Sequence, residues 1–176
     1  LREETLMDNL IDSEGTELFL SLDGTTVLAF DCPTGLTGLG FTAAERESSC
    51  LNETISKSRP GKRKLSNFQV PFRLIAGSAA HQYLLNLAKE GEANLELPFA
   101  IGLSDGTADP TISSGAFVAP GTPPNYTRTF AIGTLFVGSV SVDATDGEDV
   151  LGTFTAMPQS LEWFFKPAAS SSPVPL

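Results

Sequence analysis

The chain has 176 residues, 41% of them hydrophobic, and a formal net charge of −10. This length suits a single domain, and the acidic balance argues against binding to nucleic acid, which relies on Lys and Arg. No apolar run approaches the roughly 18 residues that cross a bilayer and no signal peptide opens the chain, so we expect a soluble protein.

The first part of the chain predicts an arm, a hairpin and a long loop. Residues 1–15 are acidic and weakly periodic, and we treat them as an N-terminal arm. Residues 16–30 hold two β-favouring runs around Asp23-Gly24, a pair typical of a tight hairpin turn. Residues 31–43 predict a strand spaced by Pro and Gly, and residues 45–64 lack periodicity and predict a long loop.

A strand and the one strong helix follow. Residues 67–77 alternate, with Phe68, Val70, Phe72 and Leu74 on one side. Pro71 cannot donate a ladder hydrogen bond, which favours an edge strand or a bulge. The next segment predicts a helix that begins at the N-cap Ser78 and ends at Gly91. Its apolar stripe consists of Ala80, Leu84, Leu87 and Ala88.

The remainder of the chain predicts mainly strands. Residues 93–106 alternate, and the side chains expected to point inward are Leu95, Leu97, Phe99, Ile101 and Leu103. Residues 106–125 are rich in Gly, Pro, Ser and Thr and predict a second long loop. Three further strands are expected at 126–144, 150–158 and 161–166, and residues 168–176 have the composition of a flexible tail.

This order of elements predicts the fold class. Strands precede and follow a single helix, without the alternation of strand and helix that builds parallel sheets. We therefore expect a mainly β domain over residues 16–167, an antiparallel β-sandwich or barrel with one flanking α-helix.

No motif for catalysis or for a cofactor is present. His81 is the only histidine, and its place inside the helix favours a residue at the packing boundary. Zinc would have almost no ligands, and neither a phosphate-binding loop nor a GxSxG sequence occurs. Cys32 and Cys50 lack CxxC spacing and predict free thiols. We expect no enzyme, no metal and no cofactor.

Four carboxylates lie within seven residues between two predicted strands: Asp143, Asp146, Glu148 and Asp149. Their spacing does not match an EF-hand loop, and strands rather than helices flank them. Glycoside hydrolysis would need sugar-stacking groups, but Trp163 is the only Trp. A solvated turn remains, and the scarcity of Trp and Tyr also argues against a lectin.

The bases are concentrated in one place. Residues 57–73 hold six bases and no acid, whereas residues 1–56 and 74–176 are both acidic. The segment KSRPGKRK (57–64) could bind nucleic acid or an anionic membrane, or be a solvated loop. A positive loop on an acidic protein can also meet an acidic patch on a neighbouring copy, which is the interpretation we prefer.

Two long stretches resemble a known family, the major tail tube proteins of long-tailed phages with non-contractile tails, lambda-type in particular. They are NFQVPFRLIAGSAAHQYLLNLAKEGEANLELPFAIGLSDG and RTFAIGTLFVGSVSVDATDGEDVLGTFTAMP, together with the long loop before Phe68. The resemblance covers about residues 16–167 and leaves out residues 1–15 and the C-terminal tail. It implies a fold shared with the tubes of contractile tails and type VI secretion systems.

The resemblance also implies a function. Six copies would form a ring whose inner sheets join into one barrel, and rings would stack around a tape measure protein, with tail terminator and tail tip proteins at the ends. Double-stranded DNA would later pass through the bore without specific binding, and no membrane would be involved. The protein would be assembled in the host cytoplasm and reside in the virion tail.

Site residues follow from alternation combined with this architecture. The bore-facing residues are expected to be Ser139, Ser141, Asp143, Thr153 and Thr155. Contacts between rings are expected from Lys57, Arg59, Lys62, Arg63, Lys64, Asp146, Glu148 and Asp149. The acidic turn would lie at a ring rim, where it either repels DNA or receives the basic loop of the next ring. Alternatives are a carbohydrate-binding or adhesion module and a tail terminator-like or secretion tube subunit.

Overall fold

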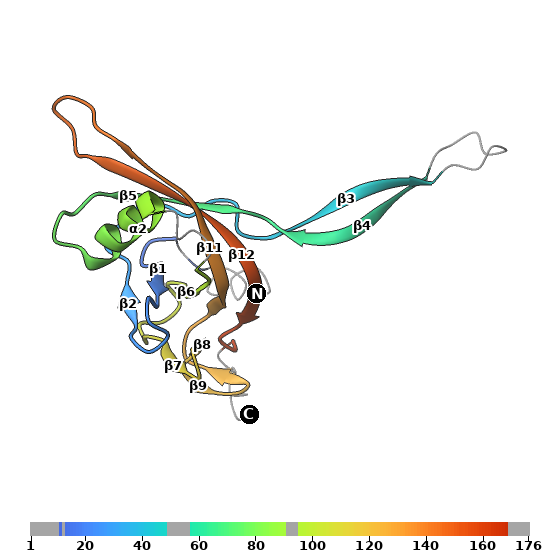
Figure 1. The fold of residues 1–176 in the computed structure, drawn as a ribbon. Helices are drawn as coiled ribbons and strands as arrows, with labels where there is room; N and C mark the ends of the chain where they lie inside the picture. Colours follow the sequence, from blue (N-terminus) through green and yellow to red (C-terminus); the bar gives the residue numbers. More distant parts are fainter. Residues whose placement is uncertain (1–10, 12, 49–56, 91–94, 169–176) are drawn as a thin grey trace, which may run out of the picture.

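The computed structural model describes residues 11, 13–48, 57–90 and 95–168. Its body is an antiparallel, curled sheet of six strands with one helix against it, as Figure 1 shows. The order is β2-β1-β6-β11-β12-β5. The strands are β1 (Glu17–Leu20), β2 (Leu28–Ala29), β5 (Phe68–Arg73), β6 (Leu97–Gly102), β11 (Phe130–Asp143) and β12 (Leu151–Phe164), and the helix is α2 (Ala79–Glu90). This confirms the predicted mainly β class with one flanking helix.

The main core lies between the sheet and α2. Phe68, Val70 and Phe72 of β5 are buried while Gln69 and Arg73 are exposed, so the predicted alternation is confirmed. β5 is also the last strand of the sheet, in agreement with its internal proline. Leu74 is only half-buried.

Helix α2 begins as predicted. The hydroxyl of Ser78 accepts a hydrogen bond from the backbone N–H of His81 at 3.4 Å, as an N-cap does. Leu84 and Leu87 are buried, but Ala88 is exposed, and it lines a hollow of about 250 Å³ together with Val137–Val140 of β11. Gly91, the predicted terminator, lies outside the described residues.

The prediction for residues 93–106 was right about the strand and about Leu97, Phe99 and Ile101, which are buried in the main core, and wrong about the two outer leucines. All six residues of β6 are buried, on both faces. Leu95 is 42% exposed, because it precedes the strand, and Leu103 is half-buried. The second face is covered by a smaller apolar cluster of Phe19, Ala100, Phe117, Ala119, Phe130 and Ile132.

Two short two-stranded ribbons cover this second face of β6. They lie almost entirely in residues 106–125, for which we predicted a loop. They are β7 (Thr111–Ser113) paired with β8 (Ala116–Val118), and β9 (Gly121–Thr122) paired with β10 (Asn125–Tyr126). Strands of two or three residues are too short for their alternation to be visible in a sequence rich in Gly and Pro.

The other predicted loop is strand in its described parts, residues 45–48 and 57–64. β3 (Phe41–Ser48) and β4 (Lys57–Leu65) form an antiparallel two-stranded ribbon, which we call the arm. Figure 1 shows the arm extending to the right, away from the body. The described side chains of residues 42–46 and 58–60 are exposed on both faces of the arm, so the sequence shows no hydrophobic period there.

The β1–β2 hairpin is present, but its connection is not a two-residue turn. Residues 21–27 link the two strands. The Asp23 carboxylate accepts hydrogen bonds from the backbone N–H groups of Thr26 (2.7 Å) and Thr25 (2.9 Å). These bonds hold the pKa of Asp23 well below its usual range. Gly24 has a positive φ of 74° next to this carboxylate.

The last two long strands form one hairpin. The strands predicted at 150–158 and 161–166 are continuous as β12, which pairs with β11 from Phe130–Phe164 at one end to Asp143–Leu151 at the other. Two register shifts interrupt the pairing, one of them where Ser160 and Pro158 meet Thr134 and Leu135. The acidic turn joins the strands at the tip.

Candidate assembly surfaces

The five residues predicted to face a bore share one face of the sheet. Ser139 lies directly opposite Thr155, Ser141 opposite Thr153, and Asp143 opposite Leu151. Residues directly opposite in an antiparallel pair point to the same side. The three residues of β11 are exposed and the two threonines are half-buried. Whether this side faces a bore stays a prediction.

Strand β5 extends this surface by one more strand. Gln69 lies opposite Thr155, Pro71 opposite Thr153 and Arg73 opposite Leu151. We call the combined surface the polar face. It consists of Gln69, Pro71, Arg73, Ser139, Ser141, Asp143, Leu151, Thr153 and Thr155. The other side of these strands is the core, with Phe154 and Ala156 fully buried.

One edge of this part of the sheet is open. β11 pairs with β6 only as far as Leu135, and beyond that point, within the described part of the chain, it pairs with β12 alone. The edge from Phe136 to Asp143 therefore has unpaired backbone groups, which natural proteins usually cover.

The opposite edge is already covered by the chain's own backbone. Gln69 and Thr37 exchange hydrogen bonds of 2.8 and 3.0 Å between their backbone N–H and C=O groups. Thr34 N–H donates to the Pro71 carbonyl at 2.8 Å, and Arg73 N–H donates to the Cys32 carbonyl at 3.1 Å. The two edges of the polar face thus differ, which suits a partner that adds to one side only.

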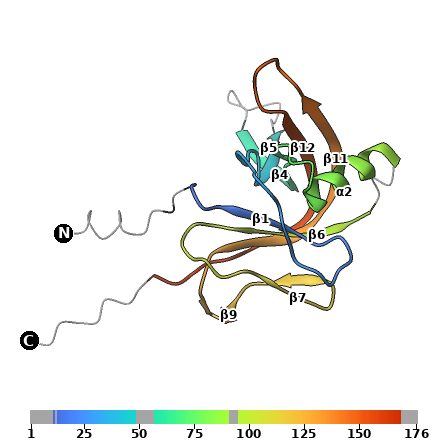
Figure 2. The same cartoon turned by 90° about the vertical axis from the view of Figure 1, so that its left-hand side faces the viewer.

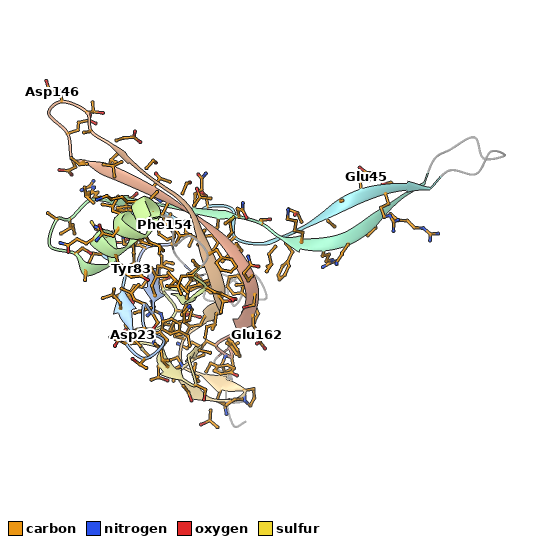
Figure 3. All side chains as sticks on the ribbon, viewed as in Figure 1. Asp23, Glu45, Tyr83, Asp146, Phe154 and Glu162 are labelled. Carbon is orange, nitrogen blue, oxygen red and sulfur yellow. The ribbon has the colours of Figure 1, made fainter. Side chains whose placement is uncertain are left out.

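The acidic turn is exposed at the tip of the β11–β12 hairpin, where Figure 3 labels Asp146. Gly147 takes a positive φ of 78° there. Asp149 Oδ2 lies 3.4 Å from Nη1 of Arg73. The two side chains are 71% and 59% exposed, and such a pair contributes only about 0 to 1 kcal/mol.

The arm divides the predicted basic residues between two faces. Arg59 lies directly opposite Arg46, and Lys64 opposite Thr42, so these cations share one face. Arg63 pairs with Ala43 on the other face. The side chain of Lys57 lies outside the described residues. The basic residues therefore come together only in part, since a ribbon presents alternate residues to opposite sides.

Arg46 was missed by the sequence reasoning, because it stands in an acidic stretch and meets Arg59 only through the arm's register. Like charges directly opposite each other destabilise a strand pair. On the other face, the Ser58 hydroxyl donates a hydrogen bond to the Glu45 carboxylate. Lys62 is exposed at the register shift between these segments. The face of the arm that holds Arg46, Arg59 and Lys64 is thus cationic, whereas Glu45 and Glu47 lie on the face of Arg63.

Arg128 was also missed, and it is fully buried. All five of its N–H groups donate. Nε donates to the Leu103 carbonyl (2.6 Å), Nη1 to Glu17 Oε2 (2.8 Å) and the Ala108 carbonyl (3.2 Å), and Nη2 to the Gly15 and Gly102 carbonyls (3.1 Å each). The signal in the sequence that could have indicated its burial is that Arg128 is a single basic residue just before the apolar strand β11. We call this group the Arg128 junction.

Thr129, the residue after Arg128, lies in a hydrogen-bonded group that holds the segment after β12 to the body. The Thr129 N–H donates to Asp105 at 2.9 Å, and the Lys166 ammonium donates to the Asp105 carbonyl at 2.7 Å. Figure 2 shows the blue segment before β1 and the red segment after β12 leaving the body on the same side. The Arg128 junction therefore lies where both chain ends emerge.

His81 is buried more deeply than a boundary residue. Its Nδ1 accepts a hydrogen bond from the Ile75 N–H at 3.1 Å, and its Nε2 lies 2.8 Å from the Asp31 carbonyl. Its ring packs against Phe72 and Phe30, with centroids 4.5 and 4.9 Å away. Both nitrogens are engaged by backbone, so the ring ties two loops to the core.

The described residues offer little metal-binding, membrane-spanning, sugar-binding or thiol chemistry. Among those residues no group of three or more His, Cys, Asp or Glu could hold a metal ion. None of the described helices is long and apolar enough to cross a membrane. Trp163 stacks on Phe165 at 5.9 Å and packs against the core, so it is no free platform for a sugar. Cys32 is a free, exposed thiol, and Cys50 lies outside the described residues.

Comparisons with known proteins agree with one another. A family model described as phage tail tube, TTP, lambda-like, matches residues 9–163. Structural protein 3 of Pseudomonas phage PAJU2 is 31% identical over 114 residues, which is 62% of this chain and 68% of that protein.

Solved tubes share the fold at low sequence identity. The SPP1 tail tube has a TM-score of 0.58 and 13% identity, covering 88% of this chain and 79% of its own. The tail of an empty GTA particle with C6 symmetry has a TM-score of 0.58 and 9% identity, covering 88% and 98%.

Proposed function

The chain belongs to the lambda-like phage tail tube family, and we propose that six copies of it form a ring and that stacked rings form a channel for viral DNA. As a member of this family it is a structural protein of the virion tail, not an enzyme. The six-fold symmetry named for the GTA tail, to which its fold is similar, supports the number six.

The observation that carries the proposal is the polar face with one open edge. A ring in which the open edge of β11 meets the next copy removes that edge, as closure does in a barrel. Each added copy brings an open edge of its own, so this head-to-tail contact continues until the ring closes.

The chemistry of the polar face suits a DNA channel. Hydroxyl and amide groups dominate it, and they carry no charge that would bind phosphates in a salt-dependent way. Asp143 and the acidic turn add negative charge at one end, which repels DNA. The bore-facing residues are thus Ser139, Ser141, Asp143, Thr153 and Thr155.

Contacts between rings would join the arm to the acidic turn of another copy. Figure 3 shows Glu45 on the arm and Asp146 at the hairpin tip on opposite sides of the body. The arm of one copy can therefore contact one neighbouring copy while its acidic turn contacts the arm of another. The cations are Lys57, Arg59, Lys62, Arg63 and Lys64, with Arg46 added by the register, and the carboxylates are Asp146, Glu148 and Asp149. Each exposed pair contributes little, but the contact recurs around the ring.

The remaining partners follow from the family. We propose a tape measure protein inside the growing tube, terminator and tip proteins at its ends, assembly in the host cytoplasm, and a tube domain spanning residues 16–167. A tail terminator would share this fold, and long tubes formed by the chain alone would separate the two roles.

The test is electron microscopy of the purified full chain. We expect six-fold rings or tubes, and a chain that stays monomeric at high concentration, even with its tail partners, would overturn the proposal.

Reversing two cations on one arm face, Arg59→Glu with Lys64→Glu, should abolish tubes while circular dichroism stays unchanged. Lys89→Glu, an exposed charge on α2, is the matched control and should assemble. Adding Asp146→Arg and Glu148→Arg to the arm variant should restore tubes. Normal tubes from the arm variant would contradict the arm contact.

A further inference from the structure

Arg73 stands out on the polar face. It is the one cation among the nine described residues of that face. Its guanidinium is 59% exposed, and it belongs to the row Arg73, Leu151 and Asp143 at the end of the face nearest the acidic turn. An arginine on a surface passed by DNA is a strong phosphate ligand, because its planar fork matches two phosphate oxygens.

The acidic turn reaches this guanidinium with one carboxylate. Asp149 Oδ2 lies 3.4 Å from Arg73 Nη1. The backbone holds the two residues together, because the Leu74 N–H donates to the Val150 carbonyl at 2.9 Å, one residue beyond each. On the other side of the row, Asp143 stands two strands away, which is about 10 Å at ordinary strand spacing.

We propose that Asp149 is a positioning residue that occupies Arg73 and so keeps it from binding the phosphates of DNA in the channel. The proposal rests on the proposed function, in which the polar face lines that channel. The pair does not need to be strong to act in this way. A phosphate that displaces Asp149 must approach Asp143 and the rest of the acidic turn, which repel it.

This role takes Asp149 out of the proposed contacts with the arm of another copy and separates it from the other carboxylates of the turn. Asp146 and Glu148 are exposed at the tip, and they remain available for the arm of another copy. The crowding of acids at one turn then has two purposes. One carboxylate neutralises a cation of its own chain and the others face outward.

The experiment compares two variants of the full chain assembled into tubes. Asp149→Asn and Asp146→Asn each remove one charge from the same turn, but only Asp149→Asn frees Arg73. A short fluorescent DNA duplex is bound to the tubes over a range of salt. Each additional phosphate that the tube neutralises should lower the affinity by a further factor of roughly 3.5 between 50 and 200 mM salt. We expect this steeper salt dependence for Asp149→Asn relative to Asp146→Asn, together with tighter binding at low salt.

A second set of variants carries Arg73→Gln. With Arg73→Gln present, Asp149→Asn and Asp146→Asn should bind DNA alike. Arg73→Gln combined with Asp149→Asn should bind like the unchanged chain, because it removes a cation together with the carboxylate that neutralises it. Equal behaviour of the two asparagine variants, or tighter binding that persists without Arg73, would overturn the proposal. If Asp149→Asn alone does not assemble, weaker DNA binding by the variant that carries both Arg73→Gln and Asp149→Asn than by the unchanged chain would overturn it too, because an occupied Arg73 adds nothing to DNA binding.

These outcomes are distinct from a failure of the proposed function. A chain that forms no tubes overturns the channel and the role of Asp149 together. Tubes in which the two asparagine variants behave alike overturn the role of Asp149 alone.

Discussion

Replacing Arg128 with methionine tests whether one buried guanidinium holds the two chain ends to the body. Methionine fills much of the space but removes all five donors. The carbonyls of Gly15, Gly102, Leu103 and Ala108 then lose a charged partner. Removing one member of a buried, hydrogen-bonded charge group costs about 3 to 5 kcal/mol, and we expect a loss in that range in the free energy of unfolding.

Glu17→Gln is the matched control, because it removes the only charged partner of Arg128 in the described chain. The Glu17 side chain is 51% exposed and screened by solvent, so we expect a loss of only about 0 to 1 kcal/mol. Urea unfolding of dilute subunits, followed by circular dichroism, measures both variants. A loss below about 1 kcal/mol for Arg128→Met, or an equal loss for Glu17→Gln, would refute the reasoning that backbone carbonyls carry the effect.

Two further predictions concern the core and a loop. A Cβ at Gly152 would lie 2.4 Å from the buried Phe72 ring, whereas one at Gly77 meets nothing within 4 Å. Gly152→Ala should therefore lose about 1 to 3 kcal/mol of unfolding free energy, with Gly77→Ala as the neutral control, and equal urea midpoints would contradict this. The pKa of Asp23 is held below its usual value by the N–H groups of residues 25–26, so its stabilising effect is present at pH 7 and lost as pH falls below about 4. The difference in thermal midpoint between Asp23→Asn and the unchanged chain should narrow from pH 7 to strongly acidic pH, and a constant difference would contradict it.

The elements that could be predicted are those with one buried face. β5 alternates because Phe68 and Phe72 enter the core, and α2 shows its apolar spacing because Leu84 and Leu87 do the same. The five residues of the predicted bore wall lie on one face because alternation along a long hairpin preserves sides. These signals are local, so sequence carries them.

The rest depends on contacts between distant segments. The arm buries little and shows no period, so neither its strands nor the meeting of Arg46 with Arg59 could be anticipated. Arg128 resembles any other base until residues 15 and 108 are brought to it. Arg73 joins the polar face only because β5 pairs with β12, and that pairing is tertiary.

The opposed arginines of the arm also bear on how subunits behave before they meet a partner surface. A two-stranded ribbon has two unpaired edges, and such edges invite other strands. Two arms brought side by side would place Arg46, Arg59 and Lys64 against the same cations of the other arm. Their mutual repulsion opposes pairing between arms and leaves acidic surfaces as the favourable target. In the proposed assembly, the arm's charge would therefore oppose contact between the arms of free subunits and favour contact with an acidic surface.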